Sequence, residues 1–159
     1  SAMPSPARPL RLVLSDAPRT KKTHNRIISI GAKCRACGRG TPRVMPSEQW
    51  TAWSDRIVPL LRAALFQLLR GSALSRVGTG PLVYVEASGD FAGAIARPVN
   101  CAAIFYRDRA AGDSHGFYQG LADVLQEADV VADDKWIVSW DGSRLDKDAA
   151  QPRVELVLS

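Results

Sequence analysis

The feature that most constrains this fold is a run of apolar residues at helical spacing between Ser47 and Gly71. A Pro-Ser-Glu sequence precedes the run and is typical of a helix start, with Ser47 as the N-cap and Gly71 as the stop. The stripe consists of Trp50, Trp53, Ile57, Leu60, Leu61, Ala64, Leu65 and Leu68. Its spacing predicts a helix with one buried face, in which both tryptophans are core anchors rather than a platform for stacking bases.

A second helical stripe follows Asp113. It predicts a helix from about Ser114 to Ala128, and an Asp or Ser at its start suits the free backbone N–H groups there. The apolar face carries Phe117, Leu121, Val124, Leu125 and Ala128. Gly120 lies inside this helix at a cost of about 1 kcal/mol relative to Ala, so we expect another group to approach closely there.

Five segments are expected to form strands, because they are short, apolar and bounded by turn residues. They are Leu10–Ser15, Leu82–Ala87, Val99–Tyr106, Trp136–Trp140 and Arg153–Leu158. Val99–Tyr106 is almost continuously apolar, which favours a central position in the sheet.

The order of these elements and the size of the chain predict a single α+β domain. A chain of 159 residues with 46% hydrophobic content is long enough for one domain with a core of its own. We expect a mixed sheet of about five strands with two main helices. Residues 1–9 are interpreted as a tag and disordered N-terminus, because Ser1-Ala2 before Met3 resembles an expression scar, and residues 10–159 as the domain.

Cysteine content and hydropathy indicate the compartment. Three cysteines are too few for a disulfide framework, and no apolar run approaches the roughly 20 residues of a membrane span. We therefore expect a cytoplasmic protein with no membrane partner.

Charge is unevenly spread along the chain, whose formal net charge is +5. The basic loop, residues 17–46, carries eight bases and no acid, whereas the chain from Asp113 onward has ten acids and four bases. Within the loop, Arg26–Ile30 and Arg43–Met45 can pair as a small ribbon. A basic loop followed by an acidic half fits a protein that grips a polyanion and does metal chemistry on it, and a solvated loop explains the charge equally well.

Acidic residues flank the second helix. Asp113 precedes it, and Asp133-Asp134 follow its end. Paired carboxylates at a turn are commonly solvent-facing, but Mg²⁺ or Mn²⁺ would also neutralise their repulsion. Because a helix separates them, local geometry does not bring Asp113 and Asp134 together within one copy of the chain.

Histidine and cysteine residues offer weaker candidates. His115 is either an exposed polar residue or a metal ligand or general base beside Asp113. Cys34 and Cys37 form half of a zinc knuckle, so they either bind structural Zn²⁺ with further ligands or remain free thiols. Cys101, inside an expected core strand, is interpreted as a small buried hydrophobe.

Four segments, in order along nearly the whole chain, resemble RusA-type Holliday junction resolvases, especially phage-borne members. They are PRTKKTHNRI (Pro18–Ile27), RVMPSEQWTAW (Arg43–Trp53), GDSHGFYQGLADVLQEADVVADDKWI (Gly112–Ile137) and PRVELVL (Pro152–Leu158). The most specific part is the succession of acid, helix, short turn and Asp-Asp pair.

This resemblance implies a homodimeric, Mg²⁺- or Mn²⁺-dependent endonuclease that cuts four-way DNA junctions symmetrically in recombination and repair, in a bacterial cytosol and encoded by a phage or prophage. Asp113 matches the first acid of the family's D-x-D, and Asp134 matches the acid of the Asp-Asp pair, with Asp133 in support. His115 stands at the second acid, and Gln119 stands where the family carries a lysine. The implied DNA-binding residues are Arg19, Lys21, Lys22, Arg26 and Lys135.

Two alternatives stay open. A non-catalytic junction-binding protein on the same fold would explain His115 and Gln119. A zinc-stabilised interaction module would explain Cys34 and Cys37.

Overall fold

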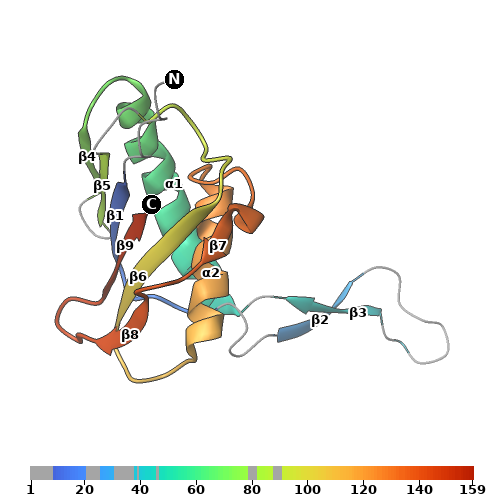
Figure 1. Cartoon of the computed structure of the whole chain (residues 1–159). Helices are drawn as coiled ribbons and strands as arrows, with labels where there is room; N and C mark the ends of the chain where they lie inside the picture. The colour runs from blue at the N-terminus through green and yellow to red at the C-terminus, as the bar shows by residue number, and fades with distance from the viewer. Residues whose placement is uncertain are drawn as a thin grey trace.

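A mixed sheet with both helices on it forms the body of the protein (Figure 1). The computed structural model describes residues 9–20, 26–30, 38, 40–45, 47–78, 82–87 and 91–159. In spatial order the strands are β4 (Leu74–Val77), β5 (Leu82–Ala87), β1 (Leu10–Ser15), β9 (Arg153–Leu158), β6 (Val99–Arg107) and β7 (Ile137–Ser139), with β8 (Arg144–Lys147) also paired to β6. The helices are α1 (Glu48–Leu69) and α2 (Ser114–Glu127). The predicted α+β class with two main helices is therefore confirmed.

The sheet has one buried face, because alternate side chains of its strands point toward the helices. Leu12 of β1 lies opposite Val85 of β5 and opposite Leu156 of β9, and Leu156 lies opposite Ala103 of β6. All four side chains are at most 1% exposed. Cross-strand rows of this kind fix the register, since a slip by one residue would turn them all to the wetter face.

Helix α1 begins and ends as its sequence predicts. Ser47 is the N-cap: its hydroxyl accepts the N–H of Trp50 at 3.2 Å and donates to the carbonyl of Thr20 at 3.0 Å. Gly71 follows the helix with a φ of +99°, a conformation that glycine adopts without steric cost. Trp50 and Trp53 are both buried, which confirms them as core anchors.

Helix α2 packs against α1 where the glycine predicts a close approach. Trp50 donates its indole N–H to the carbonyl of Gly120 at 3.2 Å. A Cβ atom on Gly120 would lie 2.9 Å from that indole nitrogen and 3.3 Å from the carbonyl oxygen of Arg19. The expected contact is confirmed, and it joins α1, α2 and the segment after β1.

The sheet has seven strands and not the expected five or so. The strand expected at Trp136–Trp140 was also partly wrong. The strands β4 and β8 escaped prediction because they are four residues long and carry few apolar side chains. The expected strand Trp136–Trp140 is shortened to β7, since a 3₁₀ turn, η1 (Asp134–Trp136), takes up its start. Its end is set by Asn100, whose side-chain oxygen accepts bonds from the Ser139 hydroxyl at 2.7 Å and the Asp141 N–H at 2.8 Å.

Part of the basic loop forms a two-stranded ribbon. The predicted ribbon exists: β2 (Arg26–Ile30) pairs antiparallel with β3 (Thr41–Met45), and Figure 1 draws it projecting from the body of the protein. No helix in the described part of the chain is long and apolar enough to cross a membrane.

Candidate functional site

Asp113 lies at the start of α2 and acts first as a helix cap. Its Oδ1 accepts the backbone N–H of Gly116 at 2.7 Å, which satisfies one of the free donors at that end. Asp113 and His115 are both exposed. A carboxylate has two oxygens with about four acceptor sites, so capping leaves Asp113 capacity for a second ligand.

The Asp133-Asp134 pair lies just beyond the other end of α2. Oδ1 of Asp133 accepts the Lys135 N–H at 3.0 Å, and the N–H of Asp134 donates to Oε1 of Gln126 at 2.9 Å. The Lys135 N–H lowers the pKa of Asp133, whereas the hydrogen bond with Asp133 raises the pKa of Asp134. The opposite directions mean that the two neighbouring carboxylates resist carrying full charge together.

One copy of the chain does not bring the predicted metal ligands together. The 14 residues of α2 lie between its N-cap Asp113 and the turn that carries Asp134, a helix length of about 20 Å at 1.5 Å per residue. His115 lies in the first turn of the same helix, at the Asp113 end. Among the described residues, no group of three or more His, Cys, Asp or Glu side chains is arranged to hold a metal ion. Asp133 and Asp134 alone match the one or two carboxylates that Mg²⁺ takes together with water and phosphate oxygens.

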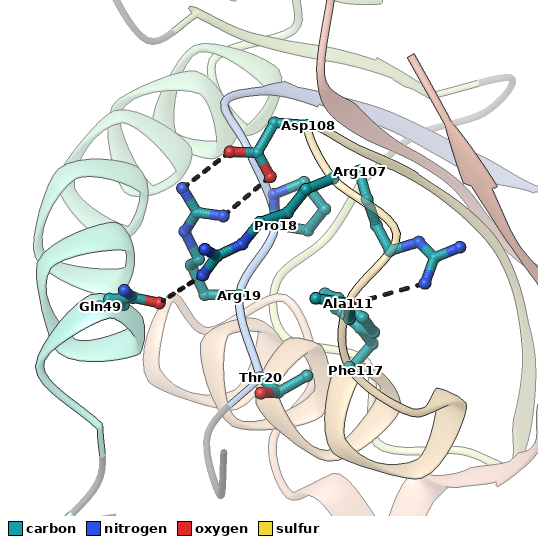
Figure 2. A pocket seen from close by; sticks show the side chains of 10 residues that line it. Pro18, Arg19, Thr20, Gln49, Arg107, Asp108, Ala111 and Phe117 are labelled. Carbon is teal, nitrogen blue, oxygen red and sulfur yellow. Dashed lines mark hydrogen bonds and ion pairs between the residues drawn. The ribbon is translucent and has the colours of Figure 1, made fainter. Parts of the chain in front are cut away.

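Arg19 belongs to a different site, a small pocket beside the start of α2 (Figure 2). Its guanidinium forms a two-bond fork with Asp108, from NH1 to Oδ1 at 2.9 Å and from NH2 to Oδ2 at 3.1 Å. This fork lowers the pKa of Asp108. The ion pair joins the segment after β1 to the loop after β6, two segments that are 89 residues apart in the chain.

Two arginines of this pocket were missed by the sequence analysis. Arg107 donates from Nε to the carbonyl of Asp146 at 3.1 Å and from NH1 to the carbonyl of Ala111 at 3.4 Å. Arg109 donates from NH2 to Oε1 of Gln49 at 3.5 Å. The signal was the charged sequence Arg-Asp-Arg directly after a buried strand, where side chains lie at a sheet end.

The other predicted residues fall elsewhere. Lys135 is the exposed middle residue of η1, with Nζ 5.5 Å from the centre of the Trp136 ring, and it lies at the opposite end of α2 from the pocket. Arg26 begins β2. The predicted DNA contacts Lys21 and Lys22 and the proposed zinc ligands Cys34 and Cys37 lie outside the described residues, as does the N-terminal tag apart from Pro9.

Cys101 behaves as a buried hydrophobe. It is fully buried in β6, and desolvation raises the pKa of its thiol to about 12. The thiol therefore stays neutral at physiological pH, which confirms the expectation that it packs in the core.

No protein-family model matches the chain, and a search of curated proteins finds no relative for it.

Proposed function

We propose that the protein binds branched DNA and, as a homodimer, cuts it with a divalent metal ion in the manner of RusA-type Holliday junction resolvases. The proposal rests on the stretch from Arg107, the last residue of β6, to Asp113, the N-cap of α2. This stretch presents two arginines to a pocket and ends at the acid that the resemblance assigns to catalysis. Gly112, which lines the pocket, directly precedes Asp113 in the chain, and this adjacency would bring a bound phosphate toward that acid.

The Asp133-Asp134 pair is the part of the chain best suited to hold Mg²⁺ or Mn²⁺. A divalent cation there supplies Lewis-acid polarisation of a phosphoryl oxygen and a more acidic bound water. Gln126 positions the pair through the backbone of Asp134, and Asp133 fixes the turn through Lys135. Asp113 and His115 would reach such a site from the second copy of the dimer, because α2 holds them away from it within one copy.

Specific observations also favour the second candidate, a non-catalytic protein that binds junctions. Asp113 is engaged as a cap, and His115 stands in place of an acid. The side-chain oxygen of Gln119 is buried without a hydrogen-bond partner among the described residues. That oxygen therefore turns into the fold, whereas a catalytic lysine at this position would need to reach the substrate.

A synthetic four-way junction incubated with the protein and Mg²⁺ or Mn²⁺ separates the two candidates. Paired nicks that disappear in Asp113→Asn and Asp134→Asn, but persist in the control Asp55→Asn on the exposed side of α1, support the nuclease. Tight binding without product supports the binder. Absence of junction binding at low salt overturns both.

Binding itself should depend steeply on salt. Six to ten phosphate contacts per dimer lower the affinity on the order of 10³- to 10⁵-fold between 50 and 200 mM salt. A flat response, measured by fluorescence anisotropy with a labelled junction, would argue against DNA as the ligand.

A further inference from the structure

We propose that the pocket between the Pro18–Thr20 segment and the Arg107–Gly112 loop binds a single phosphodiester group of the DNA backbone, with Arg109 as its main donor. This inference rests on the proposed function for the identity of the ligand. The pocket itself is defined by its charge, its size and the contacts of its side chains (Figure 2).

The charge of the pocket is strongly positive. Arg19, Arg107 and Arg109 line it together with one carboxylate, that of Asp108. Asp108 is held in the two-bond fork by Arg19, with the two side chains 34% and 26% exposed. Within the described residues neither Arg107 nor Arg109 forms a salt bridge, so two guanidinium charges remain for an anion.

Arg109 is the donor most free to change partner. Its bond to Gln49 is 3.5 Å long, at the limit of a hydrogen bond, and the side chain is exposed. Arg107, in contrast, is held by two backbone carbonyls at the end of β6. Arg109 lines the same pocket as the Arg19–Asp108 fork.

Gln49 completes the set of donors. It lies in the first turn of α1 and accepts from Arg109 through its side-chain oxygen. Its amide nitrogen carries two N–H donors, and these can serve an anion that Arg109 also contacts.

Pocket size limits the ligand to a small oxyanion. The cavity measures about 50 Å³, which is room for about three to five waters at 10 to 15 Å³ each. Pro18 and Phe117 form apolar walls, and such walls strengthen charge interactions by excluding water. A tetrahedral phosphate fits this space, whereas a base does not, so the contact is blind to sequence.

The test compares Arg109→Gln with Arg76→Gln, an exposed arginine on the edge strand β4. We expect Arg109→Gln to weaken junction binding by about tenfold at 50 mM salt and to lower the slope of log K against log salt by about 1 per chain. Arg76→Gln should leave both unchanged. Circular dichroism and thermal unfolding establish that both variants fold.

A second variant, Asp108→Asn, tests whether the charge of the pocket controls the affinity for the junction. Asp108→Asn removes the only pocket carboxylate that the described residues provide, and it leaves three guanidinium charges. Junction binding should therefore hold or tighten, whereas a general disturbance of the pocket would weaken it as Arg109→Gln does. Weakened binding in both variants overturns the assignment.

The remaining outcomes separate this inference from the proposed function. If Arg109→Gln binds the junction with the affinity of the wild type and with the same slope of log K against log salt, the pocket does not hold DNA, although the proposed function stands. If the wild type does not bind, the proposed function fails. Stabilisation of the wild type but not of Arg109→Gln by inorganic phosphate, with unchanged DNA affinity, would assign the pocket to a free anion and overturn the DNA assignment.

Discussion

The two ends of helix α2 carry opposite chemistry. At the start of the helix, three arginines line a pocket beside Asp113, and at the end two carboxylates lie together on a 3₁₀ turn. The helix dipole favours anions at the first end and cations at the second. An anion bound by the arginines and a cation bound by the Asp133-Asp134 pair would each have the sign that the nearer end of the helix favours. This contrast suggests that a phosphate binds at one end and a cation at the other.

The largest stability effect should come from Gly120, midway between the two ends. An Ala Cβ would press on the Trp50 indole and the Arg19 carbonyl, so we expect Gly120→Ala to destabilise by about 1 to 3 kcal/mol. At an unobstructed helix site the same change would stabilise by about 1 kcal/mol. Urea unfolding measures the sign, with exposed Glu127→Ala as the control. A stabilised variant would show that this contact is not tight.

Asp113, at the first end, should stabilise the fold as the N-cap of α2, independently of any role in catalysis. Asp113→Ala removes the cap of α2 and should cost about 1 kcal/mol. Asp113→Asn keeps an oxygen acceptor and should stay within a few tenths of a kcal/mol of the wild type. Thermal unfolding of both variants measures the difference. Equal losses in both would show that the negative charge, rather than the cap bond, stabilises this end.

Gln126 at the second end should have a smaller effect. Gln126→Ala deletes the exposed bond to the N–H of Asp134 and should cost about 0.5 kcal/mol. If the comparison between the two ends is right, junction affinity stays unchanged while cleavage by the metal-loaded protein falls. Anisotropy and gel assays on one preparation measure both quantities. A loss of affinity would mean that the two ends do not act separately.

The smallest effect should be the pH dependence of the Arg19–Asp108 pair. Because the folded-state pKa of Asp108 is lowered, the pair contributes stability above the unfolded-state pKa, and this is lost as the pH falls through the folded-state value. Both side chains are partly exposed, so about 0.3 kcal/mol is expected. Comparing wild type with Asp108→Asn by urea unfolding at pH 7 and pH 3 tests it. If the difference in unfolding free energy between wild type and Asp108→Asn were larger at pH 3 than at pH 7, the predicted pH dependence would have the wrong sign.

Much of the fold follows from local sequence. The caps Ser47 and Asp113, the apolar stripes and the contact at Gly120 were all predictable, because capping and periodicity depend on residues a few positions apart. The strands β4 and β8 were not predictable. In β4 the buried residue is the polar Ser75, whose hydroxyl donates to the side chain of Gln67 in α1, and β8 is held by its pairing with β6. Such strands exist because of partners distant in sequence, and periodicity does not report them.

The candidate site divides in the same way. By itself the sequence determined that α2 separates Asp113 from Asp133-Asp134, because the length of a helix follows from its residue count. Only the tertiary structure decided that Arg19 meets Asp108 and that Arg107, Arg109 and Gln49 share a pocket with them. The physical reason is that this pocket forms where three segments converge on the start of α2. Their convergence depends on how the sheet and helices pack, which no local pattern encodes.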